Sequence, residues 1–301
     1  MNRIQPPRQR TPRAWGWMAL SIVLVGCVVT SSGPGFQEVL LQGQGADKIL
    51  LIDLTGEISN EPVVIPNAGA VPGMVSRVRQ ELELAYHDPD VHGVLLRINS
   101  PGGGLTDADV IYHSLMEFKK SKKVKIVASL GDIAASGGLY VAMAADEIYA
   151  HPTTLTGSIG VIMHHMEYAG LMDKYGVTAD PVTSGKFKDI ESPYRKRTAE
   201  ETALLQKIVN HQYEKFVAVI AQGRPKMTNN QIRAIADGRV MTSEEARQAG
   251  LIDGIQYLDD TYNRLTTLSG FPDNRLIRYA NTWATGHNIY SNAFPVEGNL
   301  R

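Results

Sequence analysis

The stretch DIAASGGLY, residues 132–140, decides how this chain is interpreted. Ser136 stands between two alanines and two glycines, and a strand-like apolar run, 124–130, precedes them. This pattern predicts a sharp turn from a strand into a helix, with one hydroxyl exposed and the first helix amides directed at developing negative charge. An isolated SGG is more simply explained by a tight turn between two buried elements. A nucleophilic Ser136 therefore requires a base and an oxyanion site elsewhere in the sequence.

The composition is that of a folded protein, with 301 residues of which 43% are hydrophobic and 20% charged. This length fits one large domain or a domain with a helical extension. A net charge of -1 gives no electrostatic reason to expect nucleic acid as a partner. Because neither paired CxxC motifs nor HExxH occur, we predict no metal site and no cofactor.

Residues 1–30 predict a signal or anchor segment. Four arginines and no acidic residue precede an apolar run, 14–30, and the positive-inside bias places the rest of the chain outside the cytoplasm. Cys27 ends the tetrapeptide LVGC, which resembles a bacterial lipobox. Lipidation at Cys27 is one interpretation and an uncleaved anchor is the other. Both tether the chain to a membrane, and a single cysteine excludes intramolecular disulfides.

The remaining sequence predicts a linker over 31–46, a catalytic domain over 47–270 and a weakly ordered tail over 271–301. Strands and helices alternate through the domain. Apolar, β-branched runs predict strands over 48–58, 91–98, 124–130, 147–150 and 177–182, and helical spacing predicts helices over 73–87, 106–120, 198–222 and 259–268. This alternation predicts an α/β fold with a largely parallel sheet and a C-terminal helical extension. In such sheets the chemistry gathers beyond the carboxyl ends of the strands.

A glycine-rich segment supplies the candidate oxyanion site. Residues 101–104, PGGG, follow an apolar strand and offer unhindered amides, and Gly137 offers another beside Ser136. Two donors aimed at a tetrahedral oxyanion stabilise the transition state by several kcal/mol. The alternatives are a flexible loop or a phosphate cradle, and the absence of a following GK[ST] argues against the second.

The sequence leaves the base open between histidine and lysine. Four histidines could reach Ser136 through folding, although none lies in a triad-like pattern: His113, His151, His164 and His165. The alternative is Lys186 or Lys188, which share one face if their backbone is extended. A lysine base requires its pKa to fall from about 10.4 toward 7 or 8 through desolvation. Asp189 would oppose that fall at Lys188 unless its carboxylate points elsewhere.

Five motifs occur in the order found in a known peptidase family. The motifs are INSPGG (98–103), DIAASGGLY (132–140), LTGSIGV (155–161), SGKFKDI (184–190) and DGRVMTSEEARQAGLID (237–253). Together they resemble the bacterial signal peptide peptidase A family of Ser-Lys peptidases, which has the Clp protease and crotonase fold of repeated ββα units. The resemblance covers about 48–268. It implies that Ser136 is the nucleophile and Lys188 the general base, that the backbone of Gly103 and Gly137 forms the oxyanion hole, and that Ser158 holds the lysine.

The resemblance also implies how the chain assembles and what it cleaves. Short family members complete the dyad between neighbouring subunits of an octameric ring, and this sequence carries a single copy of each motif. The implied function is a membrane-tethered serine endopeptidase on the periplasmic side of a bacterial cell membrane, acting on cleaved signal peptides or other membrane-associated polypeptides through an acyl-enzyme. The alternatives are a crotonase-like acyl-CoA enzyme, a related membrane protease acting on stomatin-like partners, and a catalytically silent scaffold.

Overall fold

The structure is a computed structural model that describes residues 36–65 and 69–281. The chain divides into two compact units, 1–33 and 34–301. The predicted signal or anchor segment, 1–30, and Cys27 therefore lie outside the described residues. Within the described part of the chain, no helix combines the length and the apolar character needed to cross a membrane.

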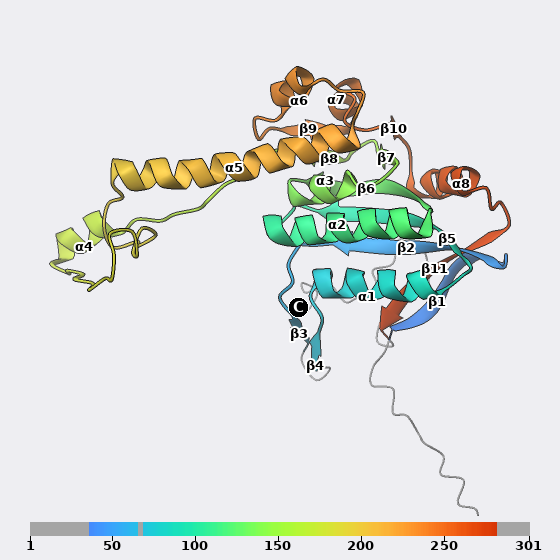
Figure 1. Cartoon of the computed structure of the whole chain (residues 1–301), viewed down its shortest axis with the longest axis horizontal. Helices are drawn as coiled ribbons and strands as arrows, with labels where there is room; N and C mark the ends of the chain where they lie inside the picture. The colour runs from blue at the N-terminus through green and yellow to red at the C-terminus, as the bar shows by residue number, and fades with distance from the viewer. Residues whose placement is uncertain (1–35, 66–68, 282–301) are drawn as a thin grey trace, which may run out of the picture. The chain divides into compact units, whose positions relative to one another are not determined.

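A mostly parallel sheet forms the centre of the second unit (Figure 1). Its four central strands lie side by side in the order β2 (Asp47–Thr55), β5 (Val91–Ser100), β6 (Lys125–Ala135) and β7 (Glu147–Ala150), and every neighbouring pair is parallel. Parallel strands buried on both faces read as near-continuous apolar runs, which is how these strands appear in the sequence. The predicted α/β architecture with a largely parallel sheet is confirmed.

Helices cover both faces of this sheet. Alternate residues of β2 point to opposite faces: Leu50 and Ile52 join the larger hydrophobic core, whereas Ile49 and Leu51 join a smaller one. The larger core includes residues of α1 (Met74–His87), α2 (Leu105–Lys122) and α3 (Gly137–Ala142), and the smaller core includes residues of α8 (Leu258–Ser269). The central strands are thus fixed between two apolar layers, and their carboxyl ends are held in one row.

Two segments that the sequence predicts as irregular form strands instead. The predicted linker, 31–46, contains β1 (Phe36–Gly43), and the predicted tail, 271–301, contains β11 (Asn274–Asn281). These strands pair antiparallel with each other, and β11 also pairs parallel with β2. The predictions were wrong over these residues because the strands are stabilised by pairing with remote segments. The predicted strand over 177–182 is also wrong, since these residues pair with no other strand.

Shorter elements complete the described chain. The strands are β3 (Val63–Ile65), β4 (Gly69–Val71), β8 (Leu155–Gly157), β9 (Val240–Thr242) and β10 (Gly254–Ile255). The further helices are α4 (Ala169–Tyr175), α5 (Ala199–Gly223), α6 (Asn229–Ile235) and α7 (Ser243–Gln248). The helices α5 to α8 agree with the predicted C-terminal helical region, which β11 then returns to the sheet.

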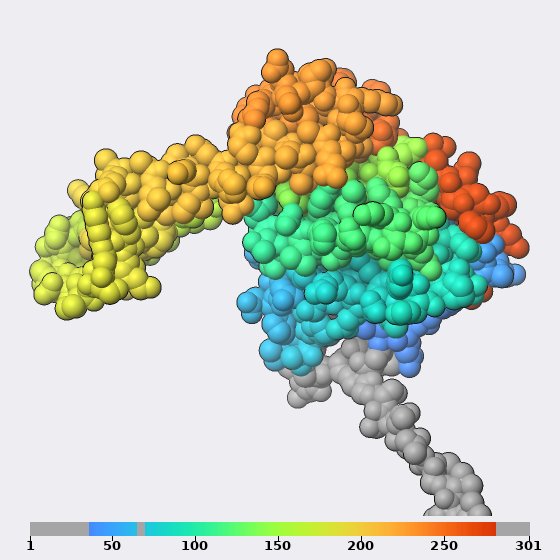
Figure 2. Space-filling view, in the orientation of Figure 1, coloured from blue at the N-terminus to red at the C-terminus, as the bar shows by residue number. Residues whose placement is uncertain are grey.

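The segment from α4 to the first half of α5 contrasts with the packed sheet. None of the residues of α4 is buried, and most of residues 162–200 are exposed. The second half of α5 packs on the core through Phe216, Val217 and Ile220. In the space-filling view the yellow and light-green segment extends beyond the helices that cover the sheet (Figure 2). Residues 162–200 are therefore held by few contacts within their own chain.

Candidate active site

Ser136 occupies the turn between β6 and α3. Its backbone has φ 52° and ψ -121°, a conformation that non-glycine residues rarely adopt and that often marks functional sites. Its N–H donates to the carbonyl of Gly157 at 3.0 Å, and its carbonyl accepts from the N–H of Tyr140 at 2.9 Å. The side chain is half-buried and caps no helix amide. The backbone is therefore fixed on both sides while the hydroxyl stays available.

Small residues are required around this turn by close packing. A Cβ on Gly138 would lie 2.8 Å from the carbonyl oxygen of Ser100. A Cβ on Gly137 would lie 3.3 Å from the Cβ of Ala108. Larger side chains here would push α3 away from β5 and α2, so the glycines after Ser136 set the position of the turn.

The PGGG loop packs directly against the serine turn. Gly102 has φ 105°, and a Cβ there would lie 2.9 Å from the Cβ of Ser136 and 2.7 Å from the amide nitrogen of Gly137. The loop is anchored from the other side by Ile58, whose N–H donates to the carbonyl of Gly102 at 2.8 Å and whose carbonyl accepts from Gly104 at 3.0 Å. The two predicted oxyanion segments are thus neighbours in space.

The backbone of Gly103 lies close to that of Gly137, the residue after Ser136. Because Ile58 bonds to the residues on either side of Gly103, the N–H of Gly103 is directed away from that bridge. Its nitrogen lies 3.4 Å from the position that a Cβ on Gly137 would occupy. Gly137 is the first residue of α3, where helix N–H groups have no intrahelical acceptor. This arrangement can receive a negatively charged oxygen.

Ser158 lies next to the candidate nucleophile. β8 continues the sheet beside the end of β6, with Ala135 opposite Gly157. Ser158 follows directly, and its N–H donates to the carbonyl of Arg239 at 2.7 Å. Its φ of 52° matches that of Ser136. Two serines with the same positive φ therefore follow directly on neighbouring parallel strands.

Lys188 and Lys186 have different surroundings. Lys186 donates a hydrogen bond to the Glu200 carboxylate. Lys188 is exposed in a turn, where its N–H donates to the carbonyl of Gly185 at 3.1 Å. Among the described residues, its amine has no hydrogen bond or ion pair. Only Lys188 therefore combines an unpaired amine with the predicted role.

The chain does not bring its own Lys188 to Ser136. The segment that contains Lys186 and Arg195 is tied to the first turn of α5 through Glu200 and Glu201. The contact of α5 with α3 lies further along the helix, where the rings of Phe216 and Tyr140 are 5.1 Å apart. Phe216 is 17 residues beyond the start of α5, which corresponds to about 25 Å along the axis. Ser136 and Lys188 are therefore far apart within one chain.

The histidine alternatives receive no support at Ser136. His151 lines a cavity of about 140 Å³ with Asp132, Arg97 and Asn99, and Ser136 does not line it. Burial lowers the pKa of His151, with a smaller opposing effect from Asp132. No hydrogen bond joins a histidine to Ser136 among the described residues. In the same part of the chain, no cluster of His, Cys, Asp and Glu side chains could hold a metal ion.

Arg195 is a residue of interest that the sequence did not indicate. It follows Lys188 by seven residues and contacts two carboxylates, those of Asp189 and Glu201. Each contact spans six positions along the chain, a separation at which side chains lie on different faces of a helix and too far apart along a strand to touch. The only available sequence signal was the requirement that Asp189 point away from Lys188.

The model of peptidase family S49 matches residues 118–271. A protein of Enterococcus faecium named "Putative signal peptide peptidase SppA" is 35% identical over 252 residues, which cover 81% of this chain and 70% of that protein. The chain belongs to peptidase family S49. Another relative, named "Putative protease slr0021", from a Synechocystis strain, is 34% identical over 76% of this chain and 77% of its own. Protease 4 of Salmonella typhi is 35% identical over 60% of this chain and 29% of its own.

Family S49 membership identifies the chain as a peptidase and gives no support to the acyl-CoA alternative. Ser136, Ser158 and Lys188 fall within the matched range, and Gly103 precedes it. Among solved structures, a point mutant of ClpP1 from Listeria monocytogenes aligns with a TM-score of 0.45 and 18% identity, over 71% of this chain and 93% of that one. A similarity this remote carries no argument about the site.

Proposed function

We propose that this S49 peptidase is a membrane-tethered serine endopeptidase with Ser136 as nucleophile and Lys188 as general base. The observation that carries the proposal is the strained, half-buried Ser136 beside the amides of Gly103 and Gly137. A nucleophile next to two convergent backbone donors is the arrangement that acyl transfer requires.

The proposed reaction proceeds through an acyl-enzyme. The Ser136 hydroxyl attacks the scissile carbonyl while the neutral Lys188 amine accepts its proton, and the carbonyl oxygen becomes an oxyanion held by the amides of Gly103 and Gly137. Lysine then protonates the leaving amine as the C–N bond breaks. Water, activated by the same amine, attacks the ester and releases the new carboxylate and Ser136. One oxyanion donor typically contributes about 10²–10³-fold in rate, and these steps require no metal or cofactor.

The contacts of the two lysines favour Lys188 over Lys186 as the base. A lysine accepts a proton only when neutral, and a carboxylate partner favours its charged form. Lys186 has such a partner in Glu200, whereas Lys188 has none among the described residues. Ser158, beside Ser136, is the proposed hydrogen-bond partner that orients the amine when the dyad is assembled.

The separation of Ser136 from Lys188 within one chain supports an oligomer with shared sites. Lys188 from one copy would complete the site of a neighbour, as the resemblance to short, ring-forming peptidases implies for an octamer. The exposed segment around Lys188 also presents apolar side chains suited to such an interface. Those with the greatest exposure are Ile162, Met166, Leu171, Tyr175 and Val182.

The proposed substrates are cleaved signal peptides or other membrane-associated polypeptides. This part rests on the predicted signal or anchor segment, 1–30, on the candidate lipidation site Cys27, and on the relative named as a signal peptide peptidase. The proposed location is the bacterial cell membrane, with the peptidase unit on its periplasmic side.

The test is hydrolysis of an unfolded polypeptide by the full chain in detergent. The unmodified protein is compared with Ser136→Ala and Lys188→Ala, each checked for folding by circular dichroism. We expect both substitutions to abolish cleavage. Activity retained by Lys188→Ala would transfer the base role to Lys186 or a histidine, and activity retained by Ser136→Ala would refute the mechanism.

Shared sites are tested by co-expressing the two inactive variants with different affinity tags. A mixed oligomer contains some interfaces with both an intact Ser136 and an intact Lys188, so we expect partial recovery of hydrolysis. An inactive mixed oligomer, isolated through both tags in turn, would contradict the shared site.

A further inference from the structure

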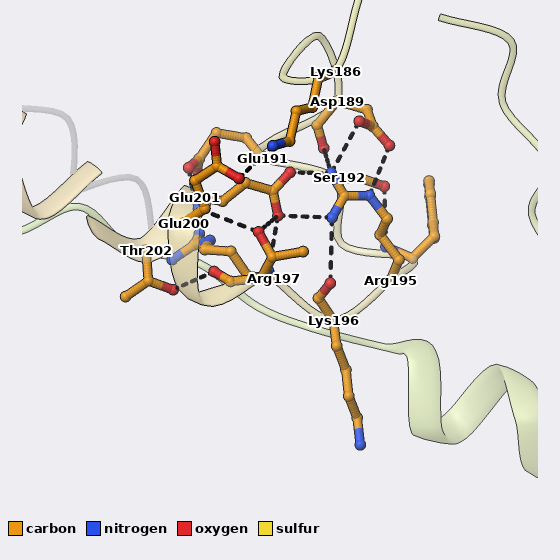
Figure 3. A network of polar contacts seen from close by, with 12 residues as sticks. Lys186, Asp189, Glu191, Ser192, Arg195, Lys196, Arg197, Glu200, Glu201 and Thr202 are labelled. Carbon is orange, nitrogen blue, oxygen red and sulfur yellow. Dashed lines mark hydrogen bonds and ion pairs between the residues drawn. The ribbon is translucent and has the colours of Figure 1, made fainter. Parts of the chain in front are cut away.

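Arg195 is the centre of an ion-pair network in the segment that carries Lys188 (Figure 3). Its Nε donates to Asp189 Oδ2 at 2.8 Å and its Nη2 donates to Oδ1 at 2.9 Å. The same guanidinium donates to Glu201, from Nη1 to Oε2 at 2.9 Å and from Nη2 to Oε1 at 2.5 Å. One arginine therefore engages both oxygens of two carboxylates, the geometry for which a planar guanidinium is suited.

Glu201 anchors this network to α5. Its side chain is only 3% exposed, and it completes a capping box by accepting from the N–H of Thr198 at 2.8 Å while Thr198 accepts from the N–H of Glu201 at 3.2 Å. The hydrogen bond from Arg195 is the main cause that lowers the pKa of Glu201, to about 2. A buried carboxylate requires such a partner, so Arg195 has a fixed position relative to the helix.

The network engages both oxygens of the Asp189 carboxylate. Both Asp189 oxygens accept from Arg195, and the backbone carbonyl of Asp189 accepts from Arg195 Nη2 at 3.2 Å. The hydrogen bonds from Arg195 also hold the pKa of Asp189 below its usual value. Asp189 is the residue next to Lys188 in the sequence, yet its carboxylate makes no hydrogen bond or ion pair with the Lys188 amine.

Every acidic side chain between residues 184 and 201 has a cationic partner. The pairs are Lys186 with Glu200, Arg197 with Glu191, and Arg195 with both Asp189 and Glu201. The helix α4, which touches this segment through the N–H of Tyr168 and the carbonyl of Pro193, contributes no ion pair to it among the described residues. Within the described chain, Lys188 and Lys196 are the two lysines of the segment left without a carboxylate.

We propose that Arg195 is a positioning residue that keeps the Asp189 carboxylate away from Lys188, so that the lysine amine can lose its proton near neutral pH. The proposal rests on the proposed function of Lys188 as the general base. A carboxylate within about 4–6 Å of an amine favours its charged form, and a charged amine cannot accept the Ser136 proton. Arg195 thus acts through Asp189 and does not touch the substrate.

The test measures how kcat/KM depends on pH, using the full chain in detergent. In Arg195→Gln the Asp189 carboxylate is free to pair with Lys188 and to favour its charged form, so a higher pH is needed to make the amine neutral. We expect the acid limb of the profile to move up by about 1 pH unit. Below that limb the activity then falls about tenfold, and it recovers at alkaline pH.

Three further variants separate this effect from a loss of structure. The double variant Arg195→Gln, Asp189→Asn has no carboxylate to pair with Lys188, so we expect the acid limb to return to its original pH. Arg197→Gln is the matched control. Arg197 lies two residues from Arg195 and pairs with Glu191, so the substitution removes the same charge without touching Asp189. We expect the acid limb to stay at its original pH. Arg195→Lys keeps the charge without the fork and should move the limb by an intermediate amount if Arg195→Gln does not fold.

The outcomes decide between the roles. A uniform loss of activity with an unmoved acid limb, which Asp189→Asn does not restore, would overturn the proposal and leave Arg195 as a structural anchor. A shift of equal size in Arg197→Gln would also overturn it, because the general charge of the segment would then be the cause. Full activity in Lys188→Ala would instead refute the proposed function, and that result is read independently of Arg195.

Discussion

The turn at Ser136 and the segment around Lys188 are held in place in different ways. The turn is enclosed by buried Ala134, Ala135 and Leu139, and the N–H of Ser136 bonds to the carbonyl of Gly157 in β8. The Lys188 segment is exposed and is tied to α5 mainly by ion pairs. Core packing is insensitive to salt and pH, whereas exposed ion pairs respond to both. The turn at Ser136 is therefore held by packing within one chain, whereas the position of the segment around Lys188 depends on charge.

The largest effect on activity is expected from a substitution that disturbs the packing around Ser136. In Gly102→Ala the new Cβ would lie within 2.9 Å of the Ser136 Cβ and within 2.7 Å of the Gly137 nitrogen, at a φ of 105° that favours glycine. We expect kcat/KM to fall by at least about 10²-fold, because the nucleophile and one oxyanion donor are both displaced. Steady-state hydrolysis of an unfolded polypeptide measures this loss.

Gly270→Ala provides the matched control for the backbone cost. Gly270 has φ 80° and no atom within 4 Å of an added Cβ, and it ends α8 outside the candidate site. We expect a stability loss of about 1 kcal/mol with unchanged kcat/KM. If Gly102→Ala kept more than a tenth of the activity, the close approach of the PGGG loop to Ser136 would not matter for catalysis.

The buried and exposed parts of α5 allow packed and exposed positions to be compared on a single helix. Ile220 is fully buried in the main core, whereas Ile208, on the same helix, is 43% exposed. We expect Ile220→Ala to lower the free energy of unfolding by about 2–5 kcal/mol and Ile208→Ala to lower it by under about 1 kcal/mol. Urea denaturation followed by circular dichroism measures both. Similar losses would show that the exposed half of α5 is packed as firmly as the core.

The sequence predicted the turn at Ser136 more fully than the contacts of the two lysines, for a physical reason. The turn at Ser136 is specified locally, since AASGG and PGGG each permit a tight approach of backbone to backbone. The spacing of Lys186 and Lys188 could not choose between them, because the choice depends on Glu200 and Arg195, which fold back from beyond the turn. No spacing in the sequence therefore predicts these ion pairs.

The same reasoning explains the errors at the edge of the sheet. β1 has no buried residue, so its sequence lacks a strand-like alternation, and its pairing partner β11 lies more than 200 residues away in the chain. Residues 177–182 contain three valines or threonines typical of strands, yet no strand lies beside them. Residues with strand propensity form a strand only where a neighbouring strand is available to pair with them.

The smallest expected effect is a pH dependence of the ion pairs that hold the segment around Lys188. The pKa of Glu201 is about 2 in the folded chain, below the value of about 4.3 for an unfolded glutamate. Its stabilising contribution is therefore complete above about pH 4.3 and is lost as the pH falls toward 2. We expect pepsin to cleave within residues 184–198 several-fold faster at pH 2.5 than at pH 4.5, because protonation of Glu201 in the opened segment weakens its hold on Arg195.

Two substitutions test whether the faster cleavage depends on the pair of Glu201 with Arg195. Glu201→Gln cannot form the ion pair at any pH, so we expect fast cleavage already at pH 4.5 and a shallower rise below it, with the remaining rise due to Asp189. Glu245→Gln is the control, because Glu245 forms the same capping box with Thr242 in α7 but has no ion pair with an arginine among the described residues. Equal cleavage of Glu201→Gln and the unmodified chain at pH 4.5 would show that the segment is held by contacts other than Arg195. The contrast with the packed serine turn would then no longer rest on charge.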